Sequence, residues 1–149
     1  MLGLQSRGES GVYESPDYVR ISLAAAITLG YVRGSFYRGA RLHCVNLLLV
    51  YREGCGARCA YCGLSRSRRV SLAWEERSFI RVDWPVVPLD DLVRRLKSGR
   101  CSHVERACVS MVTHWRARDD TLRVVRKLRE AIDLISGLIT PTIVDKEWL

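Results

Sequence analysis

Apolar residues follow two different periods along the chain and predict both strands and helices. Residues 43–51, HCVNLLLVY, and residues 104–112, VERACVSMV, are short and nearly continuously apolar. This pattern is typical of strands that are buried on both faces of a parallel sheet. A shorter apolar run over residues 138–144 predicts a third strand, and residues 78–84, SFIRVDW, alternate loosely enough to form an extended segment.

Three other stretches carry helical patterns. Residues 18–29 are rich in Ala, Leu and Ile and follow Ser15 and Pro16, which are typical of a helix start. Residues 90–98 open with two aspartates and end before a glycine. A longer apolar stripe begins at Asp119 and runs to about residue 136, where Gly137 is expected to end the helix.

Helices and strands therefore alternate, which predicts an α/β fold of βα repeats around a parallel sheet. We divide the chain into a loose N-terminal arm and helix at residues 1–35 and a βα segment at residues 36–149. The chain closes on Asp145 to Leu149, which reads as the opening turn of a further helix.

Charge and composition narrow the possible classes of protein. The formal charge is +8, but the basic residues are spread over every segment and do not favour a nucleic-acid surface. No window is apolar enough to span a membrane, and the N-terminus lacks the apolar block of a secretory signal. We therefore expect a cytoplasmic protein that binds neither nucleic acid nor membrane, with cysteines kept reduced.

Three of the six cysteines form a compact motif, Cys55-Gly-Ala-Arg-Cys59-Ala-Tyr-Cys62, directly after the first predicted strand. This CxxxCxxC spacing lets one tight loop direct three thiolates toward one centre. A [4Fe-4S] cluster offers four irons, so three cysteines leave one iron open to a substrate. Clusters that only carry electrons usually bind a protein ligand at every iron, so the motif favours catalysis.

Zinc is the alternative occupant of the motif, because zinc also binds thiolates and completes a tetrahedron with a fourth ligand. His43, Cys44, Cys101 or His103 could supply that ligand. Structural zinc sites usually present two CxxC-like pairs, whereas Cys59 and Cys62 make one such pair here, which favours iron and sulfur.

The motif has an aromatic residue before its last cysteine and lies in the loop after the first predicted strand of a βα series. In these features it resembles the radical S-adenosylmethionine (SAM) superfamily. The segments FYRGARLHCVNLLLVYREGCGARCAYCGLSR and CVSMVTHWRARDD are similar to the biotin synthase and lipoyl synthase branch, including an archaeal group with subunits of a two-component lipoyl synthase. The resemblance covers roughly residues 36–149. It implies the first half of a partial (β/α)6 barrel of the TIM type.

The resemblance implies a function and a set of site residues. Cys55, Cys59 and Cys62 would ligate the cluster, SAM would bind the fourth iron, and its reductive cleavage would give a 5′-deoxyadenosyl radical for sulfur insertion in lipoyl or biotin synthesis. Tyr61 would pack near the adenine of SAM. The family often has a Gly-Gly-Glu-like segment that contacts SAM after the second strand, and here residues 110–114 stand in its place. The candidates for that contact are Met111, Thr113 and His114.

The same resemblance implies partners. A low-potential electron donor such as ferredoxin or flavodoxin would reduce the cluster, and a lipoyl carrier protein could be the substrate. A second subunit, or a missing C-terminal half, would complete the barrel.

Two other functions remain open. A truncated, non-catalytic cluster-binding fragment would need a partner chain, and a zinc-binding nucleic-acid module would explain the positive charge. Cys44 and Cys108 lie within the predicted strands, where a cysteine commonly acts as a small apolar side chain. Their alternative role is in an auxiliary cluster that donates sulfur.

Overall fold

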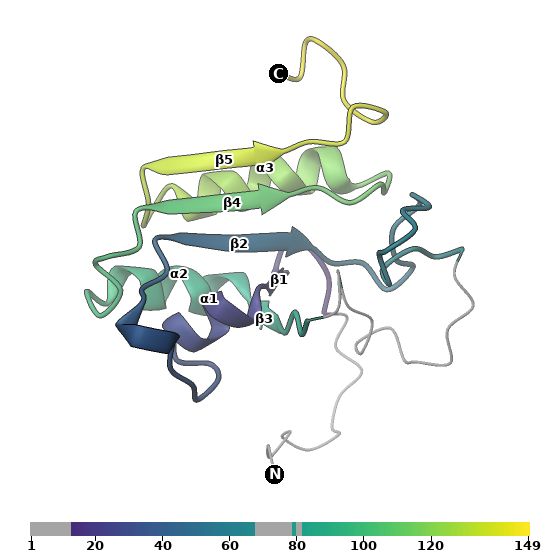
Figure 1. The fold of residues 1–149 in the computed structure, drawn as a ribbon. Helices are drawn as coiled ribbons and strands as arrows, with labels where there is room; N and C mark the ends of the chain where they lie inside the picture. The colour runs from purple at the N-terminus through teal and green to yellow at the C-terminus, as the bar shows by residue number, and fades with distance from the viewer. Residues whose placement is uncertain (1–12, 68–78, 80–81) are drawn as a thin grey trace.

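The structure, a computed structural model, describes residues 13–67, 79 and 82–149. Five strands form one sheet, shown in Figure 1, in the order β3-β1-β2-β4-β5. The strands are β1 (Tyr18–Ile21), β2 (Cys44–Leu49), β3 (Val86–Pro88), β4 (Arg106–Ser110) and β5 (Leu134–Leu138). The helices are α1 (Leu23–Thr28), α2 (Leu89–Lys97) and α3 (Ala117–Leu128), with a short 3-10 turn, η1 (Tyr37–Gly39).

The sheet is mixed and open, so the predicted half of a parallel βα barrel is wrong. β2, β4 and β5 run parallel, with Cys44 opposite Arg106 and Arg106 opposite Leu134. β1, however, pairs antiparallel with both β2 and β3. β1 precedes β2 in the chain and β3 follows it, so both antiparallel strands join one edge of the sheet before β4 continues the parallel series.

The N-terminal helix predicted over residues 18–29 is wrong in its first third. Residues 18–21 form β1, and the helix begins only at Leu23, where the side chain of Ser22 accepts a hydrogen bond from the Ala25 N–H at 3.2 Å. Ser15, expected as the helix cap, is instead fully buried, and its Oγ accepts the Val50 N–H at 3.0 Å. The arm at residues 1–12 lies outside the described residues, as do 78, 80 and 81 of the predicted extended segment.

In the second half of the chain, the predicted elements agree more closely with the observed ones as far as α3. α2 closely matches the helix predicted over residues 90–98, and β4 lies within the strand predicted over 104–112. The third helix, however, ends at Leu128, and the last strand lies at residues 134–138 and not at 138–144. Gly137, predicted to end a helix, pairs with Val109 inside the sheet.

The sheet has two unlike faces. On the first, which we call the helix face, Val45 and Leu47 of β2 and Val109 of β4 have no exposed surface and belong to one apolar core with residues of all three helices. Figure 1 shows α3 behind β4 and β5. Burying a side chain of this size stabilises the fold by about 1.5–3 kcal/mol.

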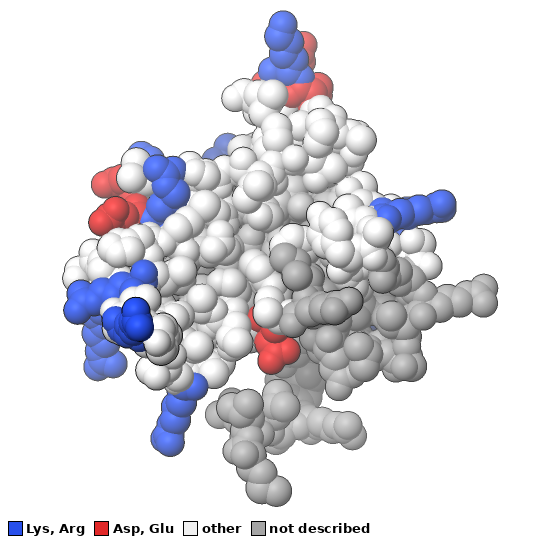
Figure 2. Space-filling view, in the orientation of Figure 1, with Lys and Arg blue, Asp and Glu red and all other residues white. Residues whose placement is uncertain are grey.

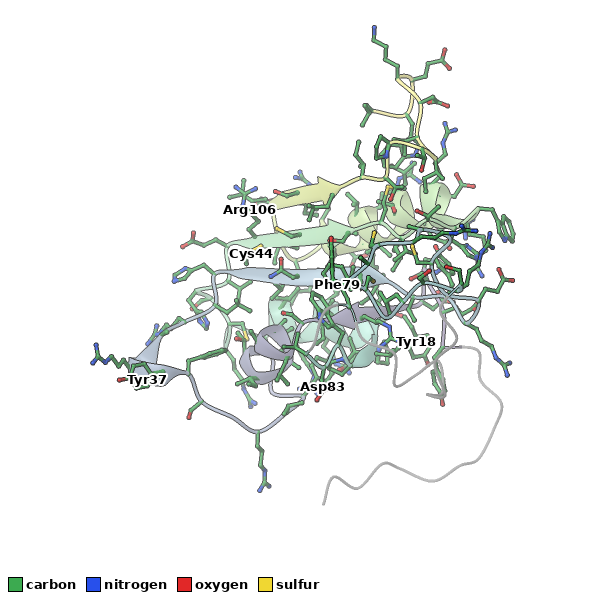
Figure 3. The ribbon with its side chains drawn as sticks, turned by 45° about the vertical axis from the view of Figure 1, so that its right-hand side comes forward. Tyr18, Tyr37, Cys44, Phe79, Asp83 and Arg106 are labelled. Atoms are coloured by element: carbon green, nitrogen blue, oxygen red, sulfur yellow. The ribbon has the colours of Figure 1, made fainter. Side chains whose placement is uncertain are left out.

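The second face, which we call the open face, bears the alternate residues of the same strands. No helix among the described residues packs on it, and its central positions are half-buried or exposed except for Leu48. Leu48 packs in a small separate cluster with Cys62 and Leu64, beside Phe79 and Trp84. Figure 3 shows Phe79 in front of β2. The residues of the open face, in strand order, are Cys44, Asn46, Leu48, Arg106, Cys108 and Ser110.

Charged side chains lie mainly at the margins of the molecule in the view of Figure 2. There, most of the coloured surface is white, Lys and Arg stand at its margins, and a small group of Asp or Glu atoms lies near the lower middle, next to the grey atoms. Among the described residues, none of the helices has the length and apolar character that crossing a membrane requires.

Candidate functional site

The loop that carries Cys55, Cys59 and Cys62, which we call the cysteine loop, leaves the sheet at the end of β2 and turns sharply at Gly54. Val50 and Tyr51 are buried, and the Gly54 N–H donates to the Tyr51 carbonyl at 3.0 Å. Gly54 has a φ of +78°, and a Cβ there would lie 2.7 Å from the carbonyl oxygen of Leu64. Only glycine accepts both this conformation and this close approach, which is why the turn can place Cys55 directly beside the sheet.

The loop is closed at its base by backbone hydrogen bonds. The Cys55 N–H donates to the Leu64 carbonyl at 2.8 Å, and the Arg66 N–H donates to the Cys55 carbonyl at 2.9 Å. Inside the loop, the Ser65 hydroxyl donates to the Ala57 carbonyl at 2.5 Å. These bonds hold the first cysteine in a fixed position relative to the residues that follow the last one.

The three cysteines differ in exposure. Cys55 is half-buried and Cys59 is exposed. Cys62 is 8% exposed and packs with Leu48 and Leu64 on the open face. The Cys62 N–H donates to the Cys59 carbonyl at 3.2 Å, so one turn carries both residues. The loop thus presents one thiol toward solvent and two toward the protein.

The segment after β4 is hydrogen-bonded to this loop. The Thr113 N–H donates to Cys55 Sγ at 3.2 Å, and the Gly56 N–H donates to the Thr113 carbonyl at 2.7 Å. A Cβ on Gly56 would lie 3.1 Å from that carbonyl oxygen, so this second glycine permits the close approach. The sequence singled out Thr113 as a SAM contact, whereas the structure joins its backbone to the first cysteine.

His114 is buried under the loop. Its ring stacks on Tyr51 with centroids 3.8 Å apart and planes 10° apart. Nδ1 accepts the Arg116 N–H at 3.2 Å, so a neutral ring carries its hydrogen on Nε2, which lies 3.3 Å from Glu53 Oε2. In this position His114 braces the end of β2 against the end of β4.

A charged network behind His114 was not foreseen from the sequence. The Tyr51 hydroxyl donates to Asp120 Oδ2 at 2.9 Å, and Arg116 Nε lies 3.3 Å from the same oxygen. Burial, and then the negative charge of Asp120, raise the pKa of Tyr51 well above its usual value. Arg116 also forms an ion pair with Glu14 at 2.9 Å. Asp120 read as an ordinary charge in the first turn of a helix, and nothing local marks it as buried.

The remaining two predicted SAM contacts lie in different environments. Tyr61, next to Cys62, is 69% exposed. Met111 is 8% exposed and belongs to the core of the helix face. Its N–H donates to the Leu138 carbonyl at 2.9 Å. The structure therefore brings Thr113 and His114 to the cysteine loop, leaves Tyr61 on the loop surface, and places Met111 in the core.

A site for a single metal ion needs several ligand side chains grouped around one point. Within the part of the chain that the structure describes, no three His, Cys, Asp or Glu side chains are grouped to hold one ion. Thiolates that share one zinc bind it at about 2.3 Å and so lie close together. In a cubane each cysteine binds a different iron, so the cubane does not require that close grouping.

The donor set of the loop fits an iron–sulfur cluster. It offers three thiols, a backbone N–H already directed at one of their sulfur atoms, and two glycines where the chain approaches most closely. A comparison of the chain with protein-family models, with curated proteins and with solved structures finds no match.

Proposed function

We propose that Cys55, Cys59 and Cys62 bind a [4Fe-4S] cluster and that the protein uses this cluster to cleave S-adenosylmethionine reductively. The observation that carries the proposal is the loop itself: three thiols within eight residues, on a loop closed at its base, follow a buried strand of a parallel series. The similarity of these residues to the radical SAM motif supports the same proposal.

Residues around the loop prepare it for such a cluster. The hydrogen bond from the Thr113 N–H to Cys55 Sγ would stabilise a thiolate at this position, as bonds to ligating sulfur atoms commonly do. His114 and Tyr51 hold the ends of β2 and β4 together beneath it. Tyr61 has an exposed ring beside Cys62, free to stack on a nucleoside.

When bound, the cluster would supply the electron that breaks the sulfonium bond, with its cysteine-free iron open to the amino and carboxylate groups of SAM. Sulfur insertion in lipoyl or biotin synthesis is the reaction class that we propose from the sequence resemblance. A ferredoxin or flavodoxin would provide the electron.

The test is anaerobic reconstitution of the full chain with iron and sulfide. We expect a brown protein with about four irons that releases 5′-deoxyadenosine from SAM in the presence of dithionite. Cys55→Ala, Cys59→Ala and Cys62→Ala should each lose most of the bound iron. Cys101→Ser is the matched control, because Cys101 is buried and donates to the Thr28 carbonyl at 3.4 Å, a bond that Ser preserves.

Two results would contradict the proposal. The first is a colourless protein that carries stoichiometric zinc and no iron. The second is a set of alanine variants that keep their iron and sulfide at the level of Cys101→Ser.

A further inference from the structure

Cys44 and Cys108 lie together on the open face, away from the cysteine loop. Cys44 begins β2, and Cys108 lies in the middle of β4, opposite Asn46. Their Sγ atoms are 2.8 Å apart, and both side chains are half-buried. Figure 3 shows Cys44 and Arg106 near the start of their neighbouring strands.

We propose that Cys44 and Cys108 form a reversible disulfide that joins β2 to β4, made by exchange with a low-molecular-weight disulfide. Disulfide sulfur atoms lie about 2.05 Å apart, so the two Sγ atoms need to approach by about 0.8 Å. Since both thiols are partly exposed on a face without a covering helix among the described residues, a small oxidant can reach them.

The exchange proceeds in two balanced steps. The Cys108 thiolate attacks one sulfur of the small disulfide, whose S–S bond breaks and releases a first thiol. The Cys44 thiol then loses its proton and attacks Cys108 Sγ, which releases the second thiol. Two protein thiols are oxidised, one small disulfide is reduced, and the two thiol protons pass to the leaving groups.

Cys108 takes the first step because Cys44 ionises with difficulty. Burial, and then the hydrogen bond and charge of Cys108, raise the pKa of the Cys44 thiol to about 12. Cys44 therefore acts second, when its neighbour is already bound to the oxidant and the attack is intramolecular.

The sheet prevents Cys44 from pairing with the cysteine loop. β2 runs from Cys44 to Leu49, and at about 3.3 Å per residue it separates Cys44 from the loop by about 20 Å. Cys101 is buried and donates to the Thr28 carbonyl. Cys108 is therefore the expected partner of Cys44, and formation of this disulfide does not depend on the cluster proposed above.

The test is peptide mapping of the full chain after incubation with oxidised glutathione and alkylation of the remaining thiols. Trypsin places Cys44 in residues 42–52 and Cys108 in residues 107–116, each as the single cysteine of its peptide. We expect these two peptides to be recovered as one disulfide-linked species that dithiothreitol separates.

Two variants complete the test. Cys108→Ser should abolish the linked species, and Cys101→Ser should leave its yield within about twofold of the wild type. Glutathione adducts on both peptides of the wild-type chain, without the linked species, would overturn the proposal. So would a linked species that joins residues 42–52 to a peptide of the cysteine loop. Because the wild-type map is decisive alone, a variant that fails to fold does not affect the outcome.

Discussion

The helix face of the sheet is packed into the core, whereas the open face carries reactive side chains. On the helix face, alternate residues of β2 and β4 are fully buried against the three helices. On the open face, the residues between them other than Leu48 are polar, charged or sulfur-bearing, and they include the Cys44–Cys108 pair. The cysteine loop joins this second face through Cys62 and Leu64.

Because of this difference, neighbouring residues of one strand are under different packing constraints. Leu47 must fill a closed space, whereas Cys44 and Asn46 need only tolerate a half-buried position. A protein built in this way can vary the residues of its open face while its core remains packed. The predictions below test that separation.

The largest effect is expected from a cavity on the helix face. Leu47→Ala should lower the free energy of unfolding by about 4 kcal/mol, because the side chain is fully buried and leaves a space that its neighbours fill poorly. Asn46→Ala, one residue away on the open face, should cost about 0.5 kcal/mol. Urea unfolding of both variants measures the difference, and equal losses would show that the two faces are packed alike.

Oxidation of the open face should stabilise the chain by a smaller amount. A disulfide between Cys44 and Cys108 joins residues 64 positions apart, and disulfides that restrict the unfolded chain typically contribute about 2–4 kcal/mol. The midpoint of urea unfolding should therefore rise on treatment with oxidised glutathione and return with dithiothreitol. Cys108→Ser should show no rise, and a rise of the same size in that variant would assign the effect to other thiols.

The turn that leads from β2 into the cysteine loop should be sensitive to one methyl group. Gly54→Ala forces a left-handed backbone on Ala and places its Cβ 2.7 Å from the Leu64 oxygen, so we expect a loss of about 2 kcal/mol and poor retention of iron. Gly99→Ala has a similar φ of +77° but open space around it.

Gly99→Ala therefore isolates the conformational part of the cost, which should be about 1 kcal/mol. Calorimetry and iron analysis compare the two variants. If Gly54→Ala binds iron as well as Gly99→Ala does, the close approach at Gly54 does not shape the cysteine loop.

The sequence predicted the elements whose pattern is local. The apolar runs around β2 and β4 identified both strands, and the paired aspartates with the apolar stripe of residues 90–98 identified α2. β1 was missed because its four residues become a strand only by pairing with Leu47–Leu49, a partner that is remote in the chain. β5 was misplaced because Ile132 and Ile135 continue the helical spacing of α3 beyond its true end.

The same distinction applies to the candidate site. Cys55, Cys59 and Cys62 form a contiguous motif, so their proximity was readable from the sequence. The bond from Thr113 to Cys55 Sγ joins residues 58 positions apart, and the bond from Tyr51 to Asp120 joins residues 69 positions apart. Such contacts depend on how the segments that follow β2 and β4 meet at the end of the sheet, and no local pattern in either segment shows this.

The smallest predicted effect concerns acid and lies on the helix side of the molecule. Burial opposes the ionisation of Asp91, but hydrogen bonds to the carboxylate outweigh burial and hold the pKa of Asp91 below its usual value. These hydrogen bonds include one from Arg95, at 2.8 Å, and one from Arg94. A carboxyl group whose pKa is lowered in the folded state stabilises that state at pH values above the group's unfolded pKa of about 3.9. This contribution is lost as the pH falls through the folded-state pKa.

Asp91→Asn should therefore lower the free energy of unfolding by about 1 kcal/mol at pH 6 and flatten its decline between about pH 4 and pH 2. Asp90→Asn is the matched control, because Asp90 is 83% exposed and its ion pair with Lys127 at 3.1 Å is open to solvent. Arg95 also donates to the Leu29 carbonyl at 2.9 Å, so loss of Asp91 loosens the contact between α2 and α1. Since that contact is on the helix side, disulfide formation between Cys44 and Cys108 should be unchanged in Asp91→Asn, and a changed yield would show that the two faces are coupled.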